Sequence, residues 1–269
     1  MARFHKDGTG TVRHLAGWKR SPPVPGTHRR QFSRLVTPVP LPDRTRVDYF
    51  TQAPVRDQGQ WGRCVGEMWR ALFCSLGIRA GKGVINYSSW FAYNMGRDYE
   101  GTPLTEDSGL VISDSAESVE KNGMCLDEFM PSDEDHFSEE PSPEAKANGA
   151  EHQLIMAYHC PTLDEIRRSL ADGWVVGIGM SVFENMMSPE AARTGVVKMP
   201  EPGERLLGGH AVVLWDCDMK EVIEGRVGQL TCRTPWGEDW GQKSDFKLPV
   251  DYVNEGLADE ALTPRLIEQ

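Results

Sequence analysis

The sequence lacks any long apolar run. No stretch approaches the roughly 18 to 20 consecutive apolar residues that a membrane-spanning helix needs, and residues 1–8 contain no apolar signal-peptide core. We therefore expect no membrane span, no secretion by the usual route, and a location in the cytoplasm, or in the virion if a phage encodes the chain. With 27 glycines, 18 prolines and 26% charged residues among 269, the composition excludes a collagen-like, coiled-coil or wholly disordered protein.

Cysteines are also few, and their spacing does not suggest pairs. The six thiols are spread along the chain without a C-x-x-C motif, unlike the disulfide framework of a small secreted protein, so we expect them to be reduced. His159 and Cys160 are adjacent, but no further ligands follow at the spacing of a zinc site. The sequence therefore predicts no metal ion and no organic cofactor.

Positive charge is concentrated at one end of the chain. The net charge is −11, which argues against a general nucleic-acid binder, yet residues 1–46 carry ten lysines or arginines against two aspartates, a net charge of +8. The same segment holds six of the 18 prolines and shows no sustained helical or strand period. Two interpretations of this N-terminal arm stay open: a solvated tail, or an arm that docks on the acidic body of the chain or on a protein partner.

Hydrophobic periodicity makes the first half mostly helical. Apolar residues recur on one face from Gly62 to about Gly77, which predicts a helix buried on one side. Shorter helical patterns follow at 88–95 and at 113–122, and Gly123 has the position of a helix-terminating glycine. The acidic segment 131–143 is typical of a surface loop.

The second half is mostly β. One helix is expected at 162–171, and strands are expected at 174–183, 210–215, 228–233 and 245–248, whereas the residues after about 256 show no pattern.

A loop with two glycines, Gln58-Gly-Gln-Trp-Gly-Arg, precedes Cys64 and places this cysteine at the start of the first expected helix. A helix N-terminus carries partial positive charge and unpaired N–H groups, which favour the thiolate, the nucleophilic form of cysteine. A free cysteine is more often a small buried apolar residue, so Cys64 needs a base before it indicates catalysis.

Among the seven histidines, His210 has the setting of such a base. It follows Gly208 and Gly209 and opens the apolar strand Ala-Val-Val-Leu-Trp, where the glycines leave room for another chain. A thiol beside an imidazole can transfer its proton and become a nucleophile.

Taken in order, these motifs resemble the papain-like cysteine peptidases, in the disulfide-poor branch of bacteria and their viruses. Cys64 and His210 are 146 residues apart, within the roughly 130 to 150 typical of that family. The resemblance covers about residues 41–253 and includes Leu41-Pro-Asp-Arg-Thr-Arg-Val-Asp-Tyr, Gln58-Gly-x-x-Gly-x-Cys64, Asp107-Ser-Gly109, Ser188-Pro-Glu, Thr194-Gly-Val-Val, Pro202-Gly-Glu, Gly208-Gly-His-Ala-Val and Trp236-Gly-Glu-Asp-Trp-Gly.

The resemblance implies a papain-like α+β fold, with the active site in the cleft between an N-terminal α lobe (47–150) and a C-terminal β lobe (151–255). The arm (1–46) precedes these lobes and a C-terminal tail (256–269) follows them. It gives Cys64 the role of nucleophile and His210 that of the base that later protonates the leaving amine. Gln58 matches the glutamine that, with the backbone N–H of Cys64, stabilises the oxyanion, at roughly 3 to 4 kcal/mol per donor. Without the resemblance, Gln58 is an ordinary polar loop residue.

Three further positions border the substrate by the same resemblance. Gly109 matches the glycine along which the substrate backbone lies, although a simple turn glycine is an equal alternative. Gly209 adjoins the histidine on the substrate side. Trp236 matches the tryptophan that shields the histidine and its partner from water.

The chain also departs from the family pattern. The family has an asparagine two residues before the shielding tryptophan, and this chain has Thr234 there. A threonine hydroxyl can accept a hydrogen bond from imidazole, but it is shorter than an amide. Trp61 occupies the position where secreted relatives have a half-cystine, which agrees with a reducing compartment, and Val65 stands where many relatives have tryptophan.

The sequence therefore predicts a thiol peptidase that cleaves peptide or protein substrates through a Cys64 thioester. Thr234 and the basic arm motivate an alternative, a papain-fold protein with weakened catalysis and a binding or assembly role, for instance as a phage structural component. A third alternative is a transferase or amide hydrolase, because the site defines acyl transfer better than it defines the acceptor.

Overall fold

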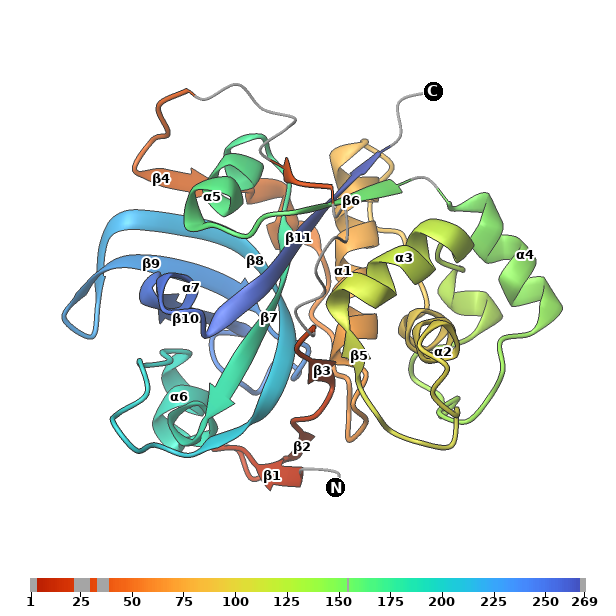
Figure 1. Cartoon of the computed structure of the whole chain (residues 1–269), viewed down its shortest axis with the longest axis horizontal. Coiled ribbons are helices and arrows are strands. Elements are labelled where there is room, and N and C mark those ends of the chain that lie inside the picture. Colours follow the sequence, from red (N-terminus) through yellow and green to blue (C-terminus); the bar gives the residue numbers. More distant parts are fainter. Residues whose placement is uncertain (1–3, 22–29, 33–38, 154, 267–269) are drawn as a thin grey trace.

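The computed structural model describes residues 4–21, 30–32, 39–153 and 155–266, and these form a helical lobe beside a β lobe (Figure 1). The predicted α+β class is confirmed: the long helices come from the first half of the chain and the main sheet from the second. None of the described helices is long and apolar enough to cross a membrane.

The helical lobe is built around one buried helix, α1 (Cys64–Arg79), in which 14 of 16 residues are buried. It begins two residues after Gly62 and extends two residues past the expected end at Gly77. The side chains of Ser88 and Ser142 accept backbone hydrogen bonds at the starts of α2 and α4, and Gly123 ends α3 with a φ of +70°. The other helices of this lobe are α2 (Ser89–Tyr99), α3 (Ile112–Asn122) and α4 (Pro143–Glu151).

The β lobe is an antiparallel sheet with strand order β10-β9-β8-β7-β11-β6, and β4 pairs with β8 beside this path. The strand that carries His210 is far longer than the six residues expected from its apolar run, because Leu206–Gly209 before that run pair with β7 and the mostly polar residues after it pair with β9. The elements are β4 (Arg44–Arg46), β6 (Ile155–His159), α5 (Leu163–Ala171), β7 (Val176–Phe183), α6 (Pro189–Thr194), β8 (Leu206–Ile223), β9 (Arg226–Arg233), β10 (Asp245–Pro249), α7 (Asp251–Asn254) and β11 (Ala258–Leu266).

The assignment of residues 256–269 to a C-terminal tail was wrong for its described part. Strand β11 lies between β7 and β6 and pairs with both, so it belongs to the interior of the sheet (Figure 1). Its sequence, Ala-Asp-Glu-Ala-Leu-Thr-Pro-Arg-Leu, has polar residues at buried positions, which hides the pattern of a strand. Residues 267–269 lie outside the described part.

Residues 4–21 of the arm are ordered along the junction of the two lobes, whereas Arg44–Arg46 of the arm form β4 on the β sheet. Strands β1 (Phe4–Lys6) and β2 (Val12–His14) form a hairpin, and β3 (Trp18–Lys19) pairs in parallel with β5 (Leu110–Val111). Figure 1 shows this segment running upward from the N-terminus between the sheet and the helices. The absence of a strand period in the sequence reflects how short these strands are. The prolines at 22, 23, 25 and 38 lie outside the described residues.

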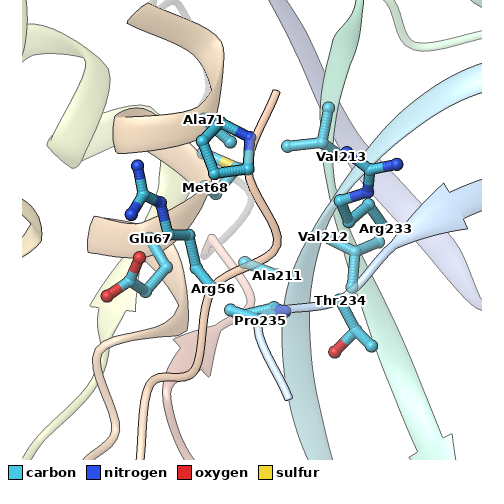
Figure 2. Close-up of a pocket in the computed structure, with 11 residues that line it drawn as sticks. Arg56, Glu67, Met68, Ala71, Ala211, Val212, Val213, Arg233, Thr234 and Pro235 are labelled. Atoms are coloured by element: carbon cyan, nitrogen blue, oxygen red, sulfur yellow. The ribbon is translucent and has the colours of Figure 1, made fainter. Parts of the chain in front are cut away.

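The two lobes meet where α1 packs on β7 and β8. Gly177 of β7 leaves room for Met68, whose sulfur would lie 2.6 Å from a Cβ at that position. Figure 2 shows Met68 and Ala71 of α1 facing Val212 and Val213 of β8 across a narrow cavity of about 20 Å³. This packing fixes α1, which begins with Cys64, relative to β8, which carries His210.

Candidate active site

Cys64 is the first residue of α1 and is fully buried. The loop before it turns at Gly59, whose φ of +64° favours glycine. The Sγ atom of Cys64 accepts a hydrogen bond of 3.4 Å from the backbone N–H of Ala211. Because Ala211 directly follows His210 in β8, this contact brings the thiol of one lobe to the histidine strand of the other.

His210 is also fully buried, and its ring is held from two sides. Its Nε2 atom is 2.7 Å from the hydroxyl oxygen of Thr234, and its ring stacks on that of Trp236 at 4.7 Å between centroids. Its Nδ1 atom has no hydrogen-bond partner among the described residues. The geometry leaves Nδ1 as the nitrogen available for a proton from a thiol.

The hydroxyl of Thr234, although shorter than an amide, reaches the imidazole of His210. Thr234 follows β9 directly, in the segment that leads to Trp236, and it lies at the lower edge of the cavity in Figure 2. The side chain is buried, so water does not compete for this hydrogen bond. At the position where the resemblance implies an asparagine, the chain therefore has a hydroxyl in contact with the imidazole.

Gln58 is buried near the start of α1, but its amide points elsewhere in this state. Its Nε2 atom donates to the carbonyl oxygen of Trp61 at 2.7 Å, and its Oε1 atom is buried without a partner. Its backbone N–H donates to the carbonyl oxygen of Pro235, next to Trp236. The loop is thus attached to the histidine side of the site, while the oxyanion role requires the amide to turn away from Trp61.

Burial governs the charge state of the two central groups. Loss of water raises the pKa of Cys64 to about 12 and, with the charge of Arg13 as a second cause, lowers the pKa of His210 to about 3. Both side chains are therefore neutral near pH 7. The expectation that the helix N-terminus favours a thiolate is wrong for this closed site, because desolvation outweighs the partial charge of the helix end.

The arm is what closes the site. A Cβ added to Gly17 would lie only 2.5 Å from Sγ of Cys64, so the arm backbone is in contact with the thiol. On one side, the N–H of Gly209 donates to the carbonyl oxygen of Leu15 at 2.8 Å. On the other, the N–H of Leu110 donates to the carbonyl oxygen of Gly17 at 2.9 Å.

Gly109 and Gly209 therefore both border an extended chain, and here that chain is the arm. Gly109 has a φ of +69°, and a Cβ there would lie 2.0 Å from the carbonyl oxygen of Ala16. A Cβ on Gly209 would lie 2.5 Å from the ring of Trp18. Only glycine allows a backbone to approach this closely at both positions.

Arg13 attaches the arm beside the histidine. The guanidinium is buried and donates to Asp7 of the arm, to Asp57 of the body and to the carbonyl oxygen of Trp236. It also lies over the Trp236 ring, 5.5 Å from its centroid. One arm cation thus joins the arm hairpin to both sides of the site.

A second attachment lies at Asp107. Its carboxylate accepts hydrogen bonds from the N–H of Gly62 and the hydroxyl of Tyr93, and it is 3.1 Å from Nδ1 of His14 in the arm. Burial tends to raise the pKa of Asp107, but its contacts with His14 and with the hydroxyl of Tyr93 together hold that pKa below its usual value. Asp107 belongs to the Asp107-Ser-Gly109 motif, which by itself indicates no role for the carboxylate.

The structure thus brings together Cys64, His210, Thr234, Trp236 and both glycines, with Gln58 at the edge of the group. Sequence reasoning missed the arm residues that cover the site. The charge imbalance between arm and body was a signal for docking, but it could not indicate where the arm binds.

Comparisons with known proteins bear on the sequence and the fold of the chain. No family model matches the chain. It is 28% identical over 215 residues, covering 76% of this chain and 67% of the relative, to an uncharacterized peptidase C1-like protein, L477, of Acanthamoeba polyphaga mimivirus. The fold is that of the papain-like cysteine peptidases, as predicted, and the resemblance that the motifs indicated is confirmed.

Two solved structures illustrate the fold. Xylellain, a cysteine protease from Xylella fastidiosa, superimposes with a TM-score of 0.78 at 22% identity, covering 94% of this chain and 97% of xylellain. The digestive procathepsin L 3 of Tenebrio molitor larval midgut gives a TM-score of 0.64 at 16% identity, over 88% of this chain and 76% of the procathepsin.

Proposed function

We propose that this protein is a cysteine peptidase whose N-terminal arm keeps it latent. The observation that carries the proposal is the convergence of a helix-terminal thiol, a buried imidazole and the orienting hydroxyl of Thr234 at the junction of the two lobes. A sequence relative described as a C1-like peptidase supports it.

The proposed reaction uses only groups of the chain. His210 takes the proton of Cys64, and the thiolate attacks the peptide carbonyl to form a tetrahedral intermediate. The backbone N–H of Cys64 and the amide of Gln58, once turned from Trp61, donate to its oxyanion. His210 then protonates the leaving amine as the C–N bond breaks, and a water molecule hydrolyses the thioester with His210 again taking the proton.

Latency follows from the position of the arm. A substrate backbone needs the space beside Cys64 that Gly17 fills, and it needs the N–H groups of Gly209 and Leu110 that the arm carbonyls occupy. Removal of the arm readmits water to the thiol and imidazole, which lowers the cost of forming the thiolate–imidazolium pair.

The test compares labelling of the thiol with turnover. An epoxide or iodoacetamide reagent should label Cys64 slowly in the wild type and quickly in Gly17→Val, and only Gly17→Val should cleave a mixed peptide library. Cys64→Ala and His210→Ala in the Gly17→Val chain should abolish cleavage while folding is unchanged. A labelled, folded Gly17→Val chain that cleaves no peptide would favour the binding or assembly role instead.

We also propose that the protein works in a reducing compartment, the cytoplasm or a virus particle. All six cysteines are free and buried. Trp61, at the position where secreted relatives have a half-cystine, stacks on Phe137. Thiol counting on protein isolated from its native source should find six free thiols, and any native disulfide would refute this.

A further inference from the structure

The residue directly before the nucleophile, Arg63, is a buried cation that takes no part in the reaction of Cys64 and His210. It is 5% exposed, and its position in the motif Gln58-Gly-x-x-Gly-x-Cys64 is one that the resemblance leaves open. A buried charge is costly unless other groups bind it. The partners of Arg63 therefore indicate what this side chain does.

One side of its guanidinium is held by the helical lobe. Nη1 donates to the hydroxyl oxygen of Ser89 at 2.8 Å and lies 3.4 Å from Oε1 of Glu67, a residue that is 2% exposed. The hydroxyl of Ser89 donates to the same carboxylate oxygen at 2.7 Å. The guanidinium also lies 4.3 Å from the centroid of the Trp90 ring. These contacts with α1 and α2 fix the position of the Arg63 head group.

The other side of the guanidinium holds the loop that carries Gln58. Nε donates to the backbone carbonyl oxygen of Gln58 at 3.2 Å, and Nη2 donates to that of Asp57 at 3.5 Å. The forked shape of arginine allows one side chain to bind the helices and the loop at once. From the histidine side, the carbonyl oxygen of Pro235 accepts from the backbone N–H of Gln58 at 2.9 Å. The Gln58 backbone is thus held from both lobes, so its amide turns away from Trp61 about a fixed point.

Arg63 also orients the second oxyanion donor, because the N–H of Cys64 belongs to the peptide bond between these two residues. The direction of that N–H depends on the backbone of Arg63, which has a φ of −94° and a ψ of 22°, in the sparsely populated region between helix and strand. A side chain anchored to α1 and α2 restricts rotation of this backbone. One residue therefore links both donors, Gln58 through its carbonyl and Cys64 through the shared peptide bond.

We propose that Arg63 is a positioning residue of the reaction, which holds the Gln58 amide and the Cys64 N–H where the oxyanion forms. This inference rests on the proposed function, since it concerns the same reaction. Donors stabilise a tetrahedral intermediate most when they need no rearrangement as its charge develops. Loss of the Arg63 contacts should therefore impair peptide cleavage far more than it impairs a reaction of the thiol that forms no oxyanion.

The first test needs no turnover, because it asks whether Arg63 holds the loop in the full chain. Hydrogen exchange of segment 57–63, followed by mass spectrometry, should be at least about fivefold faster in Arg63→Met than in the wild type. Arg70→Met is the matched control and should exchange like the wild type: Arg70 is also a buried arginine of α1, 3.7 Å from Glu67, but it bonds to Asp127 of the helical lobe. Unchanged exchange in Arg63→Met, or equally fast exchange in Arg70→Met, overturns the proposal.

The second test separates oxyanion chemistry from the reactivity of the thiol, in the Gly17→Val chain. Iodoacetamide loses iodide from a saturated carbon and forms no oxyanion, whereas peptide cleavage requires one. Arg63→Met should lower kcat by about 100-fold, with KM and the alkylation rate of Cys64 within about twofold. Arg70→Met should leave all three within about threefold. In a Gln58→Ala chain, Arg63→Met should lower kcat by less than about tenfold, because one of the two donors is already absent.

Arg63→Lys keeps the test decisive should Arg63→Met fail to fold. Lysine retains the charge beside Glu67 and should melt close to the wild type, but its single ammonium lacks the fork that reaches Gln58, so kcat should stay at least about tenfold low. A folded Arg63→Lys chain with the kcat of its parent, or a fall in kcat matched by an equal fall in alkylation, overturns the positioning role. Cleavage of no peptide by the Gly17→Val chain contradicts the proposed function, and hydrogen exchange then decides by itself whether Arg63 holds the loop.

Discussion

Gly17→Val should open the active site by steric conflict alone. A Cβ at residue 17 would lie 2.5 Å from Sγ of Cys64 and 2.7 Å from the carbonyl oxygen of Gly62. Neither neighbour can withdraw easily: the N–H of Gly62 is held by Asp107 at 2.9 Å, and Cys64 is fixed in the first turn of α1. The clash is therefore relieved by displacement of the arm.

The size of the effect follows from the cost of overpacking. Adding methyl groups to a filled site typically costs about 1 to 3 kcal/mol, which shifts an equilibrium between closed and open forms by about 5- to 150-fold. Alkylation of Cys64 proceeds through the open form when opening and closing are fast, so its rate should rise by the same factor.

The assay is iodoacetamide labelling at fixed pH, with the labelled cysteine identified by mass spectrometry and folding followed by thermal melting. Val12→Ala, at a 41% exposed arm position, is the control and should react like the wild type. A Gly17→Val chain that is folded and no more reactive than the wild type would refute the closing role of the arm.

Three further predictions concern the groups around the histidine. In the Gly17→Val chain, Thr234→Val removes the hydroxyl bonded to His210 at 2.7 Å and should lower kcat by about 10- to 100-fold, while Thr234→Ser should retain most activity in the same peptide assay. Burial lowers the pKa of His210 to about 3. Below about pH 6.5 the imidazole of the unfolded chain therefore binds a proton that the folded chain does not bind. The free energy of unfolding should therefore fall by about 1.4 kcal/mol per pH unit from this source as the pH drops from 6 to 4. In urea denaturation, the dependence of this free energy on pH should be weaker in His210→Phe than in the wild type. An equal dependence would contradict the lowered pKa of His210. Arg13→Ala leaves Asp7 buried without its cation and should weaken arm docking by about 3 to 5 kcal/mol, which is measured as faster proteolysis of the arm. Asp7→Asn in the same chain should restore part of the protection. An arm that resists proteolysis in Arg13→Ala would show that the ion pair is dispensable.

The helices of the first half follow from local chemistry. Apolar spacing, the serine caps and Gly123 act within a few residues of each other, so their effect is visible in the sequence, and the observed ends differ from the expected ones by a few residues. Strand β11 was missed because its burial depends on β6 and β7 rather than on its own apolar pattern.

The residues of the candidate site that lie in short sequence motifs could be predicted. Cys64 and His210 were singled out from their own segments, and Thr234 and Trp236 from the resemblance to the papain-like family. The charge state of Cys64 and His210 was not predicted correctly. The partial charge of a helix N-terminus depends on one element, whereas the thiol and imidazole are neutral because the arm removes water from both.

The sequence by itself determined a mostly helical first half, a mostly β second half and the residues available for thiol chemistry, since these depend on periodicity and on short motifs. Only the tertiary structure decided that the basic arm lies in the cleft, with Gly17 against Cys64, Arg13 beside Trp236 and Trp18 over Glu260. Net charge attracts an arm to an acidic body without selecting a position. The position depends on where glycines of distant strands leave space and where buried polar groups need partners, and both depend on contacts between residues far apart in the chain.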